Sequence, residues 1–552
     1  MGFLCLCLIT DSRKSTGKTN LQITKHLKLE APMGEKKKLE VLHNNRTFGP
    51  TQYAKKHIFL DIDNVVEWDL GIYQHFPKPE KIPTTGLEGG PTGSWNARLA
   101  AGWGSILYED GKFRGWVCNM PSIGGLDENA DVWLTAYIES DDGFVWRKPN
   151  LRITGQDRWP GNNLLKLPGC IMSVVRPLHG AGFRYLAATI QIAPPYPGVC
   201  DDGSVIYNGN GTYLFASDDG FEWKQITANP IIVHGDWACL HVDRTRGRYL
   251  LFNKIGVNHG LTSRRSNIVV ESKDAVHWEG YEGYRQWHMC FAPDDYDDII
   301  AAAHGFRIGE FYNHAIHQVD KLYVAVQTLF MVGLPLRNIM GQNPAGQALM
   351  RLAFSHDGMI WRHPRGRPAF IEGGPPGSPD AGFITSQGNI VDVGEDQYLY
   401  CFGSKVDHGF GILPDFRLDP NIPFEDQERN STPFVAKFKR DRFASLASTY
   451  RARFDVEIGP VQGKELRINA VTRGDGVIKV AIAEQSIPLH LCPRKSEFLP
   501  GFSFEDCVPF VGDSVGEPIR FKKKTIADLP VGKSFILRFE INRGEVFGYE
   551  WV

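Results

Sequence analysis

The chain has 552 residues, and its formal net charge is only -2. Because so small a charge creates no long-range basic field, nucleic acid and anionic membrane surfaces are excluded as default partners. Hydrophobic residues make up 42% of the chain and aromatic residues 12%, with 58 glycines, a mixture that indicates a large all-β protein with many turns and room for two domains.

Residues 1–55 are polar and basic without sustained periodicity, so we expect a tail or extended arm. The apolar stretch 2–10 is too short for a membrane span and makes a poor signal peptide, which leaves the compartment open. Ten cysteines show no metal-binding spacing. We expect buried free thiols at four of them, which lie in apolar runs: Cys118, Cys170, Cys239 and Cys401.

Residues 57–66 predict a strand that carries Asp61 and Asp63, and a long Pro- and Gly-rich connection follows at 76–93. From residue 104 the chain divides into five similar units, each with an apolar strand, a turn and an aromatic strand. The first strands of the five units are expected at 105–108, 170–175, 238–243, 311–317 and 382–393.

Four of these units end on the signature Ser-x-Asp-Gly-x-x-Trp, at 140–146, 217–223, 272–278 and 355–361, with Ala275 in the glycine slot of the third. The pattern predicts a hairpin in which Asp caps the turn, Gly takes a positive φ, and Trp begins the return strand and packs under the turn. One repeated supersecondary unit indicates a radial or solenoid fold, and five four-stranded blades around an axis give an economical closure.

After residue 440 the pattern changes to shorter alternating strands, expected at 453–458, 465–471, 477–483, 519–521 and 534–541. This alternation, broken by turn signals, predicts a β-sandwich. The sequence therefore predicts an all-β chain with an arm at 1–55, a five-bladed β-propeller at 56–440 and a C-terminal β-sandwich at 441–552.

A five-bladed propeller with such hairpins and a C-terminal β-sandwich resembles the furanosidase-type glycoside hydrolases of families 32 and 43, above all the "family 32 N-terminal-like" proteins. The resemblance covers most of residues 57–552. It implies a substrate funnel at one end of the axis, with acids at the start of the innermost strands. Three acids are implied: a nucleophile or base in the first blade, an Asp that stabilises the cationic transition state, and a Glu that acts as general acid.

The chain offers Asp236, Glu310 and Asp380 before the third, fourth and fifth inner strands. Glycosidic cleavage needs at least two carboxyl groups, one to protonate the leaving oxygen and one to attack or activate water. The first blade departs from the resemblance, because Ser94–Arg98 contains no acid. Asp61 or Asp63 could replace it if the early strand reaches the funnel.

Further residues are candidates for binding a saccharide. The expected sugar contacts are Trp95, His234, Tyr312 and His314, and the expected clamps for a carboxylate or hydroxyl are Arg98 and Arg264. The run 294–298 resembles a cation site by its acidic composition but lacks EF-hand spacing, so a surface charge run is the preferred interpretation. No metal and no other cofactor is predicted.

These observations favour an exo-acting glycosidase for oligo- or polysaccharides, with Glu310 as acid and Asp236 as stabiliser or base. A polysaccharide lyase is the alternative, in which His or Tyr removes the proton beside a uronate carboxylate that an Arg holds. A third possibility, from another class, is a sugar-binding propeller without turnover. The lyase would leave an unsaturated product, the hydrolase would not, and the binding protein would give none.

Overall fold

The computed structural model describes residues 54–91, 93–97, 99–121, 133–153, 159–191, 211–233, 235–259, 262–280, 287–333, 346–408, 432–484 and 497–552. The predicted all-β class is confirmed, with 54% strand and 3% helix. Among the helices of these residues, none has the length and apolar character needed to cross a membrane.

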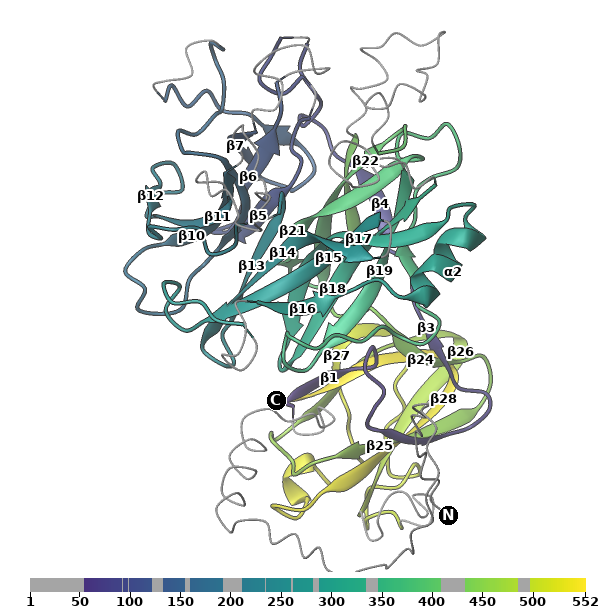
Figure 1. The fold of residues 1–552 in the computed structure, drawn as a ribbon. Helices are drawn as coiled ribbons and strands as arrows, with labels where there is room; N and C mark the ends of the chain where they lie inside the picture. Colours follow the sequence, from purple (N-terminus) through teal and green to yellow (C-terminus); the bar gives the residue numbers. More distant parts are fainter. Residues whose placement is uncertain are drawn as a thin grey trace, which may run out of the picture. The chain divides into compact units, whose positions relative to one another are not determined.

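Five antiparallel meanders of four strands each follow one another in the described chain (Figure 1). Meander 1 consists of β5 (Gly104–Glu109), β6 (Lys112–Asn119), β7 (Leu134–Ser140) and β8 (Trp146–Arg147). Meander 2 consists of β9 (Cys170–Val175), β10 (Tyr185–Gln191), β11 (Gly211–Ser217) and β12 (Lys224–Gln225). Meander 3 consists of β13 (Ala238–Asp243), β14 (Arg248–His259), β15 (Thr262–Ser272) and β16 (His288–Phe291).

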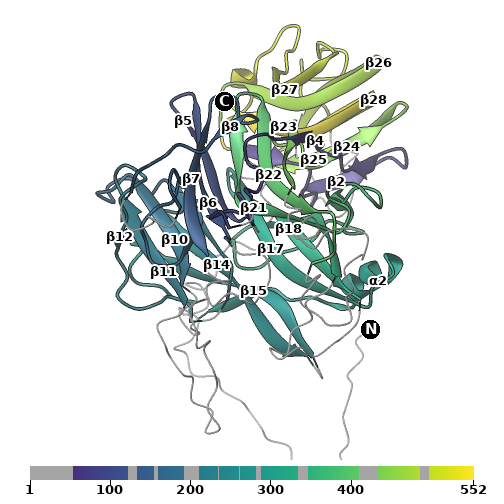
Figure 2. The same cartoon turned by 90° about the horizontal axis from the view of Figure 1, so that it is seen from above.

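The last two meanders are joined into one sheet by a single parallel bridge between their first strands (Figure 2). Meander 4 consists of β17 (Ile308–Val319), β18 (Leu322–Val332), β19 (Gly346–Ser355) and β20 (Ala369–Ile371), and helix α2 (Asp295–Ala303) precedes it. Meander 5 consists of β21 (Phe383–Val393), β22 (Asp396–Ser404), β23 (Thr432–Lys439) and β4 (Glu80–Pro83), so an N-terminal strand completes it.

The first strands of the five meanders contact one another in a closed ring, from β5 through β9, β13, β17 and β21 back to β5. Side-chain hydrogen bonds connect neighbours: Ser105 Oγ accepts from the Val174 N–H at 2.9 Å, and Ser173 Oγ donates to the Leu240 carbonyl at 3.3 Å. The ring closes where Asn389 Nδ2 donates to the Ile106 carbonyl at 2.7 Å. All first strands therefore begin at one end of the ring and finish at the other.

The predicted signature hairpins are confirmed in their geometry. In the first, Asp142 Oδ1 accepts from the N–H groups of Phe144 and Val145, both at 2.8 Å, and Trp146 Nε1 donates to the Gly143 carbonyl at 3.1 Å. The other three copies repeat these bonds, and the glycine slot has positive φ in all four, including +64° at Ala275. The tryptophans are thus equivalent, although Trp146 is buried and the other three are half-buried.

These hairpins also hold the meanders together, because a hairpin can pack on the second strand of the preceding meander. Trp116 of β6 donates through Nε1 to the Gly220 carbonyl at 2.7 Å. Tyr400 of β22 donates to the Gly143 carbonyl at 3.2 Å, which ties meander 5 to meander 1.

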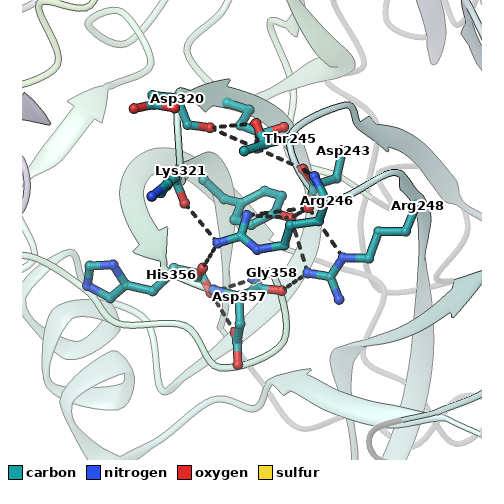
Figure 3. A network of polar contacts seen from close by, with 12 residues as sticks. Asp243, Thr245, Arg246, Arg248, Asp320, Lys321, His356, Asp357 and Gly358 are labelled. Carbon is teal, nitrogen blue, oxygen red and sulfur yellow. Dashed lines mark hydrogen bonds and ion pairs between the residues drawn. The ribbon is translucent and has the colours of Figure 1, made fainter. Parts of the chain in front are cut away.

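Arginines make the same connection between meanders 3 and 4, at the end of the ring where the first strands finish. In Figure 3 the side chains of Arg246 and Arg248 reach the backbone of the hairpin at 356–358, where they donate to the carbonyls of His356 and Asp357. Asp243, at the end of β13, accepts from the hydroxyl of Tyr323 and pairs with both arginines. The charges at this end are therefore used in structural ion pairs.

The remaining strands form one eight-stranded sheet with its own hydrophobic core. They are β1 (Lys56–Ile58), β2 (Val65–Trp68), β3 (Tyr73–His75), β24 (Ser445–Ser448), β25 (Ala452–Ile458), β26 (Leu466–Glu484), β27 (Asp513–Pro518) and β28 (Phe535–Trp551), with a 3₁₀ turn at Ile526–Asp528. β26 runs through both strands predicted at 465–471 and 477–483, with a register shift between Thr472 and Val477.

The predicted start of the propeller at residue 56 is wrong. β1, β2 and β3 pair with β28, β25 and β24, so residues 56–75 belong to the C-terminal sheet. The chain joins the meanders only at β4. A short apolar strand has the same local pattern in either sheet, and its partners lie more than 350 residues away in the sequence.

A comparison of two glycines tests whether the hairpins stabilise the ring. Both Gly220 and Gly247 have positive φ, but a Cβ at Gly220 would lie 2.7 Å from the Trp116 ring, whereas a Cβ at Gly247 would meet nothing. Gly247→Ala should cost about 1–2 kcal/mol from its backbone conformation, and Gly220→Ala should cost about 1–3 kcal/mol more because its side chain is overpacked. Urea denaturation measures both, and equal losses would contradict the role of Trp116.

Candidate functional site

Five side chains meet at the end of the ring where the first strands begin. Asp236 precedes β13, Lys254 lies on β14, Arg265 lies on β15, and Glu310 and Tyr312 lie on β17. In an antiparallel meander the start of the first strand, the later part of the second and the start of the third share one end. The local fold therefore brings together residues that are up to 76 positions apart.

Asp236 and Lys254 form the more open part of this cluster. Lys254 Nζ lies 2.9 Å from Asp236 Oδ1 and 3.7 Å from the centroid of the Tyr312 ring. Burial alone would raise the pKa of Asp236, but Lys254 and Arg265 outweigh it and hold that pKa below its usual value. The Asp236 side chain is 46% exposed and that of Lys254 5%, so Asp236 is a carboxylate that is both ionised and accessible.

Glu310 is the deeper carboxyl group of the cluster, and its side chain is fully buried. Its Oε2 pairs with Arg265 Nη1 at 2.5 Å, whereas its Oε1 has no hydrogen-bond partner among the described residues. Burial raises the pKa of Glu310, and the opposing effect of Arg265 does not cancel the rise. The surroundings therefore favour the protonated form of Glu310 and the ionised form of Asp236.

A stack of aromatic rings adjoins the cluster through Tyr312. Trp103 stacks with Trp133 at 5.6 Å and with Tyr312 at 6.2 Å between ring centroids. The Tyr312 hydroxyl lies 2.9 Å from Nε2 of His408. The indole nitrogen of Trp103 is buried, and no residue that the structure describes forms a hydrogen bond with it. Flat apolar faces beside polar groups are the combination that a sugar ring needs.

Three residues of this site, Lys254, Trp103 and His408, are not among those predicted from the sequence. Lys254 carried a signal, because it is the one charged residue between Tyr249 and Val257 in an otherwise mainly apolar strand. A charge in such a strand has to find a partner, and Asp236 is that partner. Trp103 and His408 carried no such signal, since each stands in a connection of ordinary composition.

Asp380 has the contacts of a loop cap rather than those of a catalytic acid. Its carboxylate pairs with Lys81 at 2.6 Å and accepts from Ser378 Oγ at 2.9 Å and the Gly374 N–H at 3.2 Å. The prediction that it works beside Glu310 therefore needs correction: Lys81, on the last strand of meander 5, holds it.

The loop that contains Asp380 occurs twice in the chain. Gly89-Gly90-Pro91 to Ala97 and Gly373-Gly374-Pro375 to Ala381 share the pattern Gly-Gly-Pro-x-Gly-Ser-x-Asn/Asp-Ala. A Cβ at the second glycine would meet the serine oxygen at 2.3 Å in one copy and 2.2 Å in the other. Asn96 therefore has in the first loop the place that Asp380 has in the second. The position where the first blade lacks an acid is thus a loop cap in this fold.

Two predicted sugar-binding residues belong to the protein interior. His314 is fully buried among Trp237, Phe252 and Phe291, and burial lowers its pKa to about 3. Arg264 is also buried, pairs with Asp298 at 2.6 Å and donates to the Gly309 carbonyl. Both predictions are wrong. His314 lies on the apolar side of its strand, and Arg264 is held by its ion pair with Asp298 of α2.

The remaining predicted contacts have different outcomes. Tyr312 lies in the cluster, as predicted. Trp95 is half-buried, packs against the core of meander 1 and donates to Asn163 Oδ1 at 2.8 Å. Arg98 and His234 lie outside the described residues.

Asp61 and Asp63 cannot replace the missing acid. Asp61 lies 3.3 Å from His356, and Asp63 lies 2.6 Å from Arg362, both beside the hairpin at 355–361. That hairpin is at the opposite end of the ring from Glu310. Asp61, Asp63 and His356 could form a metal triad by spacing, but the Arg362 guanidinium, 3.1 Å from His356 Nε2, already supplies the cation.

The acidic run at 294–298 is neither a cation site nor a plain surface charge run. Asp294 caps the N-terminus of α2, where its side chain accepts from Tyr296 and Asp297. Asp297 is fully buried and pairs with Arg351 at 2.6 Å and Arg367 at 2.7 Å. The predicted buried free thiols at Cys118, Cys170, Cys239 and Cys401 are confirmed within the described residues.

The buried state of Glu310 predicts a dependence of stability on pH. The pKa of Glu310 is higher in the folded state than its ordinary value of 4.5. The contribution of Glu310 to the free energy of unfolding therefore falls as the pH rises above that value. Glu310→Gln removes this effect. Urea denaturation gives the free energy of unfolding of the variant and of the wild type. The variant's value minus the wild type's should be larger at pH 7 than at pH 4. A constant difference at both pH values would show that the pKa of Glu310 is not raised.

No family model and no curated protein matches the chain. Among solved structures, one described as a glycoside hydrolase matches at 14% identity over 66% of this chain and 91% of its own, with a TM-score of 0.41. An N-acetylgalactosamine deacetylase from F. plautii, in complex with a blood group B trisaccharide, matches at 14% over 66% and 96%, with a TM-score of 0.41.

A GH32 β-fructofuranosidase from Bombyx mori matches over a longer part of the chain, 86% of this one and 94% of its own, at 10% identity and a TM-score of 0.35. At such identities and scores no activity carries over. The chain is similar to propeller glycoside hydrolases of the GH32 and GH43 kinds.

Proposed function

We propose that the protein is a carbohydrate-active enzyme, specifically an exo-acting glycoside hydrolase, and that its five meanders are the blades of a propeller. The closed ring of first strands supports the blade count. The site is the cluster of Asp236, Lys254, Arg265, Glu310 and Tyr312 at the end where those strands begin. Since a fold does not imply a function, the proposal depends on the chemistry of the cluster.

The observation that carries the proposal is that two carboxyl groups with opposite surroundings meet in one cluster: Asp236 is exposed and pairs with Lys254, whereas Glu310 is fully buried and pairs with Arg265. The pKa of Asp236 is lowered and that of Glu310 is raised. Glycosidic cleavage needs one protonated and one ionised carboxyl group. Glu310 is the general acid that protonates the leaving oxygen, and Asp236 is the carboxylate that stabilises the positive charge developing on the sugar ring.

The buried floor of the site suits a terminal sugar. Glu310, Tyr312 and Phe330 are all buried and form the inner side of the cluster, whereas Asp236 is its exposed side. Trp133 stacks on Trp103, which stacks on Tyr312 of the cluster. Trp133 is half-buried, so its ring is the part of this stack that a sugar ring can reach. This closed floor supports the exo-acting mode.

A lyase is the second candidate, and Lys254 is the observation that favours it. Burial lowers the pKa of Lys254, and Arg265 stands beside it with a positive charge. A lyase would use Lys254 or Tyr312 as the base and Arg265 as the clamp for a uronate, since His314 is buried in the core. Its product would be an unsaturated uronate that absorbs ultraviolet light.

Substitution of the two carboxyl groups tests the hydrolase. Glu310→Gln should lower turnover of a natural glycoside by about 10²- to 10⁴-fold, and aryl glycosides with good leaving groups should suffer less because they need less protonation. Asp236→Asn should slow both kinds of substrate. A panel of furanosides and pyranosides, with β-fructofuranosides first, supplies the substrates, and Asp396→Asn at the half-buried start of β22 is the control.

The same assay separates the candidate functions. Ultraviolet-absorbing products from a uronate polymer would replace the hydrolase with the lyase. Saccharide binding without any product would leave a binding protein, and full activity of Glu310→Gln on a natural glycoside would remove Glu310 from the mechanism.

A further inference from the structure

We propose that His317 is a pH-sensitive contact between the ring and the C-terminal sheet. With a proton on its imidazole His317 joins the two parts, and the loss of that proton loosens them. The inference goes beyond the proposed hydrolase and does not depend on it. His317 lies near the end of β17, where the first strands finish, and therefore at the opposite end of the ring from Glu310.

The C-terminal sheet contacts the ring at this end through β1. The N–H groups of Lys55 and Lys56 donate to Asp320 Oδ2, in the turn between β17 and β18, at 2.6 and 3.2 Å. Ile58 of β1 and Phe443, which lies between β23 and β24, share one hydrophobic cluster with residues of β17 and β18. A titratable group at this joint can therefore act on both parts.

Asp441 lies between His317 and the C-terminal sheet. It belongs to the connection from β23 to β24, and its Oδ2 pairs with Lys56 Nζ of β1 at 2.5 Å. Its Oδ1 lies 3.7 Å from Nε2 of His317, which belongs to the ring. The Asp441 side chain is 4% exposed and that of His317 13%, so solvent screens this contact little.

Gln397 of β22 gives His317 a second possible partner within the ring. Gln397 Oε1 accepts from the Asp441 N–H at 3.0 Å, which fixes the orientation of the amide. Its Nε2 then has two protons for three acceptors: Asp392 Oδ1 at 2.8 Å, His317 Nε2 at 3.0 Å and Asp441 Oδ1 at 3.3 Å. Neutral His317 can accept from Gln397, but a protonated Nε2 can only donate, and its acceptor is Asp441. The proton therefore decides whether His317 bonds within the ring or to the connection that holds β1.

The charges around His317 favour the protonated form. The titratable groups that face it are Asp441, Asp392 of β21, Lys56 of β1 and His241 of β13. Burial alone would lower the pKa of His317, but Asp441 and Asp392 outweigh it and raise that pKa above 6.5, against the opposing charge of Lys56. Burial would raise the pKa of Asp441, but His317 and Lys56 hold it at about 2.

The sign of the pH dependence follows from this raised pKa. The contribution of His317 to the joint is complete below its ordinary pKa of 6.5 and is lost as the pH rises through the pKa of the folded state. Each unit by which folding raises the pKa changes the equilibrium between the closed and the open joint by about tenfold. The two parts are therefore held together most tightly in mildly acidic solution.

Hydrogen exchange of β1 in the whole protein tests the proposal, because the amides of Lys55 and Lys56 are bonded across the joint. The wild type and His317→Gln are compared at the same pH, so the intrinsic exchange rates cancel. The protection of the wild type divided by that of the variant should be larger at pH 6 than at pH 8.5. His179→Gln, on an exposed residue between β9 and β10, controls for the loss of a histidine elsewhere on the ring.

Two variants that keep the histidine move its pKa in opposite directions. Asp441→Asn removes the acid, so the pKa of His317 should fall and the pH dependence of protection should shrink to that of His317→Gln. Lys56→Met removes a repelling charge, so the pKa should rise. NMR titration of the protein with 13C-labelled histidines measures both changes, with the His317 signal assigned from His317→Gln.

The outcomes separate this inference from the proposed function. A protection ratio that is equal at both pH values or larger at pH 8.5, or a His317 pKa at or below 6.5, would overturn the inference. If His317→Gln does not fold, Lys56→Met decides: the pH at which β1 loses protection should rise, and a pH that stays in place overturns the role of His317. None of these results depends on whether the protein cleaves a glycoside.

Discussion

Closure of the ring of first strands is the constraint on which the structure depends. Four contacts between successive meanders follow from chain order, but the fifth joins β21 to β5, nearly 280 residues apart. Asn389 bonds the backbone of Ile106, Tyr400 bonds the hairpin of meander 1, and β4 adds an N-terminal strand to meander 5. Closure makes all first strands parallel, so the residues that precede them gather at one end.

The two ends of the ring use their charges differently. At the end where the first strands finish, Asp243 is saturated by Tyr323, Arg246 and Arg248, which leaves this end structural. At the other end one buried oxygen of Glu310 has no partner in the described part of the chain, which costs about 1–3 kcal/mol. An unsatisfied buried carboxyl group beside an exposed, ionised one is the asymmetry that acid–base chemistry needs.

Much of the fold could be predicted from the sequence, because strand and hairpin patterns are local. The strands 170–175 and 238–243 and the hairpin at 140–146 were placed correctly by apolar runs and the Asp-Gly turn. β1 to β3 were assigned to the wrong sheet, since a local pattern does not reveal a distant partner. The residues of the site are harder to predict. The strands of these meanders are buried on both faces, so the alternation of polar and apolar residues no longer tells which side chain reaches the open end of the ring. His314 and Glu310 lie on the same strand, and only the structure separates core from site.

A crystal structure of Glu310→Gln with a bound oligosaccharide tests the central claim most directly, because it locates the site without assuming the reaction. We expect a terminal sugar at the cluster, with its anomeric carbon between Asp236 and residue 310. Sugar bound at the other end of the ring, near Asp243 or His356, or on the C-terminal sheet alone, would contradict it.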